Sequence, residues 1–192
     1  IAGPNPSSFL HVTRPEVDLP KGSDSHAPAA HAKARENLNA FIEKGWMVQD
    51  ETPCFYLYKQ TWNGRTQTGL MAACSVAEYD NGQIKRHELT RPDKEQDRVE
   101  NMDALDAQPG LVFLAYRDSS EVVKEAIKIA GAITPAWTVT TDDSVEHSLI
   151  VVDVPHLVES LQQAFASVDA LYIADGHHRS AAASRVSAAR AE

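Results

Sequence analysis

Five consecutive residues in this 192-residue chain could do chemistry together: Asp175, Gly176, His177, His178 and Arg179. They stand between a short apolar run, typical of a buried strand, and an alanine-rich segment that favours helix. Gly176 supplies the backbone freedom that a sharp turn from strand to helix needs. The first N–H groups of such a helix are unpaired and form the positive end of its dipole, so a phosphate can bind there.

A plainer interpretation is that Asp175 only caps the helix and that the basic residues are solvated. Asp and Gly are ordinary turn residues, so this pair alone does not separate the two interpretations. The density of polar residues directly after a buried strand favours a functional site, because loops at strand ends commonly carry function.

A second cluster is His87-Glu88-Leu89-Thr90, followed by Lys94 and Arg98. Glu88 is a candidate general base, and the cationic groups, which are four residues apart and share a helix face, are candidate phosphate clamps with Thr90 beside them. The residue at position 91 is arginine, so the cluster is not the HExxH motif of zinc proteases.

A metal site could be built on Asp175, His177 and His178. Adjacent histidines on a helix point about 100° apart, however, and therefore rarely bind one ion. The chain contains no Walker loop and no GxGxxG motif, so phosphate binding would depend on the DGHHR turn.

The first half of the chain predicts helices and antiparallel hairpins. We expect an N-terminal loop with a short strand at 9–12, a loop at 21–28, and a helix that ends at Gly45. Strands at 54–61 and 65–79 should pair around Asn63-Gly64, with Trp62 opposite Arg65, and a second turn at Asn81-Gly82 should send 83–88 back along 75–79. Thr90 should then cap a helix, with Asp93 reaching back and Val99, Met102 and Leu105 as its apolar seam.

The second half predicts alternating strands and helices. The expected strands are 111–116, 137–140, 148–152 and 170–174, and the expected helices are 120–133 and 156–166. This order predicts an α/β fold of the α+β kind with a mixed sheet, not a doubly wound parallel one. The sequence has no internal repeat and no clear linker, so we expect a single domain.

Composition limits the possible partners. The chain is 43% hydrophobic and 23% charged with a net charge of −9, which is typical of a globular protein and unsuited to binding nucleic acid. No apolar stretch reaches the length of a membrane span and no signal peptide begins the chain, so a cytoplasmic location is expected. The register of the predicted hairpin places Cys54 and Cys74 on opposite faces, which predicts two buried thiols and no disulfide.

The ends of the sequence resemble cut ends. The chain begins at Ile1 without a methionine and stops at Glu192 inside a helical pattern, with no residue that would terminate the helix. We therefore expect a fragment of a longer protein.

Several segments occur in a characteristic order: SSFLHVTRPE, FYLYKQ, GLMAACSVAEYDNGQIKRHELTRPDKEQDR, LVFLAY and YIADGHHRSAA. In these segments, which cover nearly the whole chain, the sequence resembles the domain-of-unknown-function 1015 family. That resemblance implies a complete protein about twice as long. Ser180 stands where the family usually has tyrosine.

The DGHHR turn is also similar to the phosphate-binding turn of the ParB/sulfiredoxin superfamily, which includes nucleotide-dependent free serine kinases. This similarity implies that Asp175, His177 and Arg179 face phosphate or metal and that Glu88 is the base for a substrate hydroxyl. Gly176 and His178 would complete the phosphate site.

The function expected from these resemblances is phosphoryl transfer from ATP or ADP with Mg²⁺ to a small hydroxylated metabolite, with free L-serine the best guess. The alternatives are a non-catalytic nucleotide-sensing module of ParB-like type and a scaffold domain in which both motifs only cap helices. We expect a small-molecule substrate and a nucleotide as partners, no nucleic acid and no membrane. Substrate, nucleotide and oligomeric state stay open at this point.

Overall fold

The computed structural model describes residues 4–117 and 121–191. Both termini, Ile1 and Glu192, therefore lie outside the described residues, and so does Ser120, where a helix was predicted to begin. The chain divides into two compact units, each assembled from separate stretches. The first unit consists of Ile1–Gln49, Val76–Ala115 and Leu171–Glu192, and the second of Asp50–Ser75 and Tyr116–Ala170. The chain passes from one unit to the other four times, which explains why no linker marks their boundary in the sequence.

The second unit contains the hairpin that Asn63-Gly64 predicts. Strands β1 (Phe55–Trp62) and β2 (Arg65–Met71) are antiparallel, and Trp62 pairs with Arg65 as predicted. Asn63 and Gly64 have φ values of 48° and 73°, the positive values that a tight hairpin turn requires. Cys54 and Cys74 flank these strands as thiols, but Cys74 is exposed, so the prediction that both are buried is wrong.

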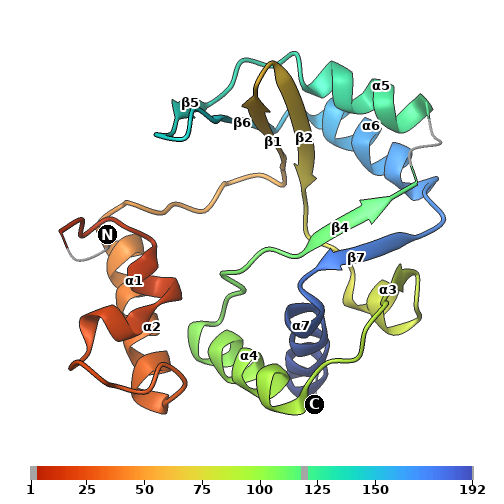
Figure 1. Cartoon of the computed structure of the whole chain (residues 1–192). Helices are drawn as coiled ribbons and strands as arrows, with labels where there is room; N and C mark the ends of the chain where they lie inside the picture. The colour runs from red at the N-terminus through yellow and green to blue at the C-terminus, as the bar shows by residue number, and fades with distance from the viewer. Residues whose placement is uncertain (1–3, 118–120, 192) are drawn as a thin grey trace. The chain divides into compact units, whose positions relative to one another are not determined.

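The sheet of the second unit has the strand order β2-β1-β6-β5, with β5 at Trp137–Thr140 and β6 at Glu146–Val152. Helices α5 (Glu121–Ala130) and α6 (Pro155–Ala166) lie side by side, as Figure 1 shows. Both pack on a core that includes Leu57, Ile150 and Leu161. The strands and helices predicted for 120–166 are thereby confirmed within the described residues.

The first unit begins with helices. The predicted strand at 9–12 is wrong: helix α1 occupies Leu10–Thr13, a 3₁₀ turn follows at Pro15–Asp18, and α2 spans Pro28–Glu43. Only Val12 of the predicted strand is buried, and it packs against Leu38 and Phe41 of α2. A helical turn satisfies its own backbone and needs no neighbouring strand. Burial of Val12 and the hydrogen bond from the Asn37 side chain to the His11 carbonyl, at 2.7 Å, hold this turn against α2.

The second predicted turn produces a helix instead of a hairpin. Residues Val76–Asp80 form α3, and Asn81-Gly82 ends that helix with Gly82 at a φ of 82°. Tyr79 of α3 is buried with Ile84, Ile173 and Ala181, and this packing decides the conformation. A three-stranded sheet results, with the order β3-β7-β4, in which β3 (Ile84–Lys85) and β7 (Leu171–Asp175) are parallel and β4 spans Phe113–Tyr116.

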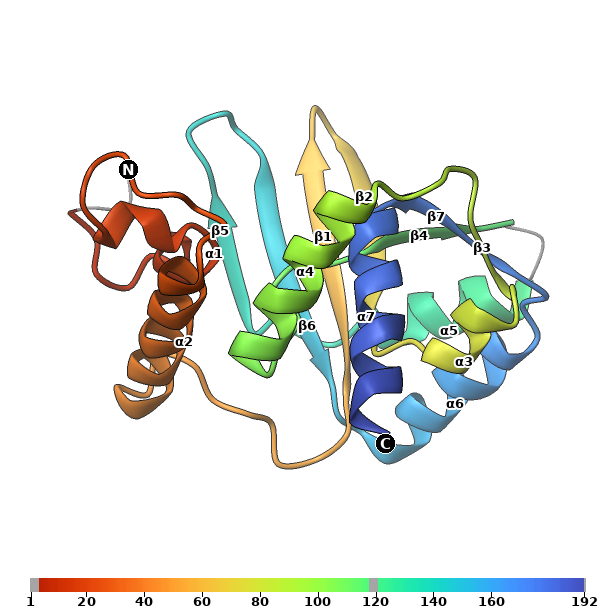
Figure 2. The same cartoon turned by 90° about the horizontal axis from the view of Figure 1, so that it is seen from below.

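Helices α4 (Pro92–Leu105) and α7 (His177–Arg190) lie side by side in the first unit, as Figures 1 and 2 show. The prediction that Thr90 caps α4 with Asp93 reaching back is wrong, because Arg91 is the cap residue and Pro92 is the first helical residue. The Thr90 hydroxyl donates instead to Glu95, and Asp93 pairs with Arg91. The architecture is α/β, as predicted, and none of the helices that the structure describes is long and apolar enough to cross a membrane.

A largely buried carboxylate, Asp97 of α4, joins that helix to α2 and to the loop before it. His26 Nδ1 lies 2.5 Å from Asp97 Oδ1, and His31 Nε2 lies 3.7 Å from the same oxygen. Arg98 Nη2 lies 2.6 Å from Oδ2 but is not aligned for a hydrogen bond. Burial would raise the pKa of Asp97, but the hydrogen bond from His26 and the charge of Arg98 outweigh it and lower the pKa.

We expect Asp97 to stabilise the fold in a pH-dependent way. A carboxyl whose pKa is lower in the folded state contributes its full stability above its unfolded pKa and loses it as the pH falls through the folded pKa. The free energy of unfolding, measured with urea between pH 6 and pH 3, should therefore fall more steeply in the wild type than in Asp97→Asn. Glu100→Gln, an exposed change on the same helix, should keep the wild-type slope. Equal slopes in all three proteins would contradict the role of Asp97.

Candidate functional site

The DGHHR turn has the predicted geometry. Strand β7 ends at Asp175, Gly176 adopts a φ of 100°, and α7 begins at His177. Ser180 N–H donates to the Gly176 carbonyl at 2.9 Å, and the three N–H groups before it have no carbonyl within the helix to pair with. No side chain among the described residues caps this helix end. Positively polarised donors are therefore available at the start of α7.

His177 joins the two predicted clusters. Its ring is buried, with Nδ1 3.0 Å from Glu88 Oε1, and its Nε2 accepts the backbone N–H of His87 at 3.5 Å. Because a backbone N–H can only donate, the proton of the neutral ring belongs on Nδ1, where it is donated to Glu88. The His87 ring meets the His177 ring edge to face, with centroids 4.4 Å apart.

His178 contacts a different part of the same segment. Its Nε2 accepts the backbone N–H of Arg91 at 3.1 Å. The two histidines therefore point to different partners, as expected for neighbours on a helix, and together they hold both ends of residues 87–91. A metal site built on Asp175, His177 and His178 is therefore not formed: among the described residues, these three side chains do not make up a cluster of potential metal ligands.

Asp175 and Arg179 pair with each other. Arg179 Nη2 lies 2.5 Å from Asp175 Oδ2, and the Arg179 side chain is 29% exposed while that of Asp175 is 73% exposed. The arginine side chain passes close to two glycines: a Cβ at Gly110 would lie 3.0 Å from its Cδ, and a Cβ at Gly176 would lie 3.2 Å from its Nε. Gly110, which nothing in the sequence marks as part of a site, thus makes room for Arg179.

A cavity of about 670 Å³ lies beside the part of α7 that follows this turn, and none of residues 175–179 lines it. It is lined by His87, Glu88, Leu89 and Thr90 of the second cluster and by seven residues that carry no signal of a site in the sequence: Tyr79, Asp80, Arg86, Glu95, Ala181, Ser184 and Arg185. Of the predicted phosphate clamps, Arg98 pairs with Asp97, and neither Lys94 nor Arg98 lines the cavity. Two other arginines, Arg86 and Arg185, do line it, and only their position in the fold reveals them.

The acidic side chains of this cavity are held by hydrogen bonds. Glu95 accepts from the Thr90 hydroxyl at 2.6 Å and pairs with Arg185 at 3.1 Å, and Asp80 accepts from the Ser184 hydroxyl at 2.6 Å. The hydrogen bond from Thr90, against the effect of burial and with help from Arg185, lowers the pKa of Glu95. Glu95 is therefore an ionised partner for Arg185 and not a proton donor at neutral pH.

Three potential metal ligands meet at the edge of the same cavity. His87, Glu88 and His177 each offer a ligand atom, and these atoms lie within 4.8 Å of one another. In the sequence His87 and Glu88 belong to one predicted cluster and His177 to the other, and no role was expected for His87. The pairing of β3 with β7 brings the two segments together. In the sequence, the only indication that His87 belongs to this site is its position next to Glu88.

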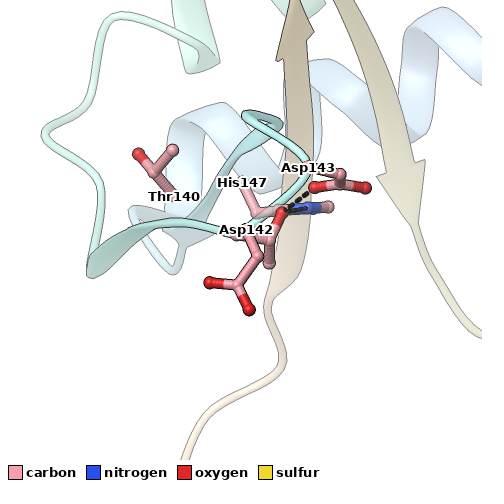
Figure 3. A pocket seen from close by; sticks show the side chains of 5 residues that line it. Thr140, Asp142, Asp143 and His147 are labelled. Carbon is pink, nitrogen blue, oxygen red and sulfur yellow. Dashed lines mark hydrogen bonds between the residues drawn. The ribbon is translucent and has the colours of Figure 1, made fainter.

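The second unit has a cavity of its own, of about 620 Å³, at the turn between β5 and β6 (Figure 3). Three of its lining residues belong to a series of hydrogen bonds: Tyr58 donates to His147 Nδ1 at 2.6 Å, His147 Nε2 lies 3.3 Å from the Thr141 hydroxyl, and that hydroxyl donates to Asp143 at 2.5 Å. Asp142 points away from His147 and Asp143 (Figure 3). Tyr58 of β1, His147, Thr141 and Asp143 thus satisfy one another's polar groups, as in a structural network.

The comparisons with known proteins identify the family. A family model described as "Protein of unknown function (DUF1015)" matches residues 1–192. The chain belongs to this family. No curated protein and no solved structure matches the chain. The resemblance of the sequence segments to the family is thereby confirmed over the whole chain.

The turn before α7 should tolerate no side chain at Gly176. We expect Gly176→Ala to lower the free energy of unfolding by the 1–3 kcal/mol typical of a strained positive φ, and by about 1 kcal/mol more because the methyl group would displace Arg179 and press on the backbone of Val112. Gly22→Ala is the matched control, since Gly22 has a φ of 94° but nothing within 4 Å of its Cβ position. Equal losses for both variants in urea unfolding would show that the contact with Arg179 does not matter.

Proposed function

We propose that this member of the DUF1015 family is an enzyme that transfers a phosphoryl group from a nucleotide to the hydroxyl of a small metabolite, with free L-serine as the best candidate substrate. The observation that supports it is the contact of His177 with Glu88 at 3.0 Å, which places a carboxylate beside the uncapped N-terminus of α7. An acceptor for a hydroxyl proton and donors for a phosphate thus lie next to each other.

Glu88 is the better base of this pair. His177 is almost completely buried, and its ring nitrogens face Glu88 and the N–H of His87, so it has no lone pair directed to a substrate. The Glu88 side chain is 54% exposed and has a second oxygen that His177 does not use. His177 is accordingly a positioning residue that holds the carboxylate by donating a hydrogen bond.

In the proposed step, Glu88 accepts the proton of the substrate hydroxyl while that oxygen forms a bond to the terminal phosphorus of the nucleotide. The phosphoanhydride bond breaks, and its electron pair leaves with the shortened nucleotide. The N–H groups of α7 and the guanidinium of Arg179 would neutralise the charge that develops on the phosphoryl oxygens.

Mg²⁺ bound to ATP or ADP would further neutralise the phosphates. Carboxylate oxygens are the ligands that Mg²⁺ prefers, and Asp175, at the end of β7 and largely exposed, is the acidic side chain of the turn that could reach it. A phosphate at the start of α7 would compete with Asp175 for Arg179, so ligand binding should rearrange this ion pair.

The second candidate is a nucleotide-binding module without catalysis. The contacts of His178 with Arg91 and of Arg179 with Asp175 favour it, because they stabilise the turn without involving Glu88. The two candidates differ in what they require of Glu88: the enzyme needs its carboxylate and the module does not.

Replacement of Glu88 tests the enzyme directly. In the full-length protein, Glu88→Gln should lower phosphoryl transfer at least about 100-fold, because a general base contributes on that scale, while nucleotide affinity stays within a few-fold. Transfer can be followed with radiolabelled nucleotide and a panel of hydroxylated amino acids. Glu100→Gln is the control and should keep wild-type rates. Full activity in a folded Glu88→Gln protein would refute the base, and wild-type nucleotide binding without any transfer would favour the binding module.

Arg179 should contribute to nucleotide binding in both candidates. Arg179→Ala should weaken binding by about 1.5–3 kcal/mol, which is the usual contribution of a charge-assisted hydrogen bond. Isothermal titration calorimetry with ATP and ADP measures it, and Arg65→Ala, an exposed arginine on β2, serves as the control. Unchanged affinity in Arg179→Ala would remove the DGHHR turn as the phosphate site.

A further inference from the structure

We infer that His87, Glu88 and His177 form a binding site for a first-row transition metal such as Zn²⁺. The site would consist of two imidazoles and one carboxylate, whose ligand atoms lie within 4.8 Å of one another. They come from two segments of the chain, and Glu88 and His177 are 89 residues apart in the sequence. In the four-coordinate geometry of zinc, with bonds of 2.0 to 2.2 Å, neighbouring ligand atoms are about 3.4 Å apart. His177 Nδ1 and Glu88 Oε1, at 3.0 Å, already approach that spacing.

The ligand types select the class of metal. Imidazole nitrogens suit zinc, copper, iron and nickel, whereas Mg²⁺ and Ca²⁺ prefer oxygen ligands alone. Two histidines and one carboxylate is a ligand set found in zinc enzymes, where a further position stays open. His87 and Glu88 line the cavity of about 670 Å³, so an open position would face that cavity.

The surroundings of His177 allow the single proton of its neutral ring to change place. Ligation through Nδ1 requires the tautomer with the proton on Nε2, so the proton that Nδ1 donates to Glu88 leaves and one is taken up at Nε2, with no net change in the charge of the ring. The hydrogen bond that Nε2 then loses is the contact with the N–H of His87, which at 3.5 Å is at the outer limit and weak. The proton between His177 and Glu88 is therefore what a metal ion would displace.

This site does not depend on the proposed function. It is also separate from the position proposed for the Mg²⁺ that would accompany a nucleotide, which involves Asp175. Ligation to a cation lowers the basicity of a carboxylate, so a metal ion bound to Glu88 would weaken it as a base and slow phosphoryl transfer.

Cobalt provides the direct test, because Co²⁺ bound at four or five coordination positions by nitrogen and oxygen gives visible absorption bands that the aqueous ion lacks. We expect the full-length protein to bind one Co²⁺ with such bands and to lose them when one equivalent of Zn²⁺ is added. Glu88→Gln and His87→Ala change exposed ligands, so these variants should fold. Each should lower metal affinity at least about 10-fold, since even outer-shell changes weaken metal sites by 10- to 100-fold.

His156→Ala is the matched control, because His156 is an exposed histidine on α6 in the other unit. It should keep the wild-type Co²⁺ spectrum and Zn²⁺ affinity. The inference is overturned if the wild type gives no Co²⁺ bands, or if Glu88→Gln and His87→Ala bind as tightly as the His156→Ala protein. Because the readout is metal binding, failure here leaves the transfer assay of the proposed function unaffected.

Discussion

The contact on which the candidate site depends is the buried ring of His177 against residues 87 and 88. Burying an imidazole is costly unless both of its nitrogens find partners, and here both partners come from one short segment. His178 adds a third link by accepting the N–H of Arg91. The segment that leads into α4 is thus fixed by the first turn of α7, and with it the carboxylate of Glu88.

A second layer of contacts supports this arrangement. Arg179 lies against Gly110 and Gly176, where any larger residue would meet its side chain, and it pairs with Asp175 at the end of β7. Further along α7, Arg185 pairs with Glu95 of α4, and Arg190 pairs with Asp103 at 3.0 Å. Exposed ion pairs of this kind each contribute little stability, so their effect is to orient α7 against α4 more than to stabilise the unit.

The site combines three groups whose chemistry depends on what occupies it. With a proton between His177 and Glu88, the carboxylate is an oriented acceptor next to the helix N-terminus, as phosphoryl transfer requires. With a metal ion in place of that proton, the same atoms and the ring of His87 form a site that suits zinc better than Mg²⁺. The position of Glu88 at the edge of the cavity is common to both.

The sequence by itself determined the local elements whose signals lie within a few residues. Asn63-Gly64 specified the hairpin and its register, and Asp175-Gly176 specified the turn before α7. The reason is that Asn63, Gly64 and Gly176 have positive φ values, which favour Asn and Gly. The apolar periodicity of Ala34, Leu38 and Phe41 specified α2, and the alternation of apolar runs specified the α/β class.

Only the tertiary structure decided the rest, and the reason is packing between distant segments. Residues 9–12 and 75–79 contain strand formers, yet burial of Val12 against α2 and of Tyr79 against α7 made both helical. The pairing of β3 with β7 brought His87 and Glu88 to His177, and it placed Arg86 and Arg185, instead of Lys94 and Arg98, at the cavity. Residue types at a given spacing can nominate Glu88 and His177 separately, but which side chains meet is set by contacts between residues that are about 90 positions apart.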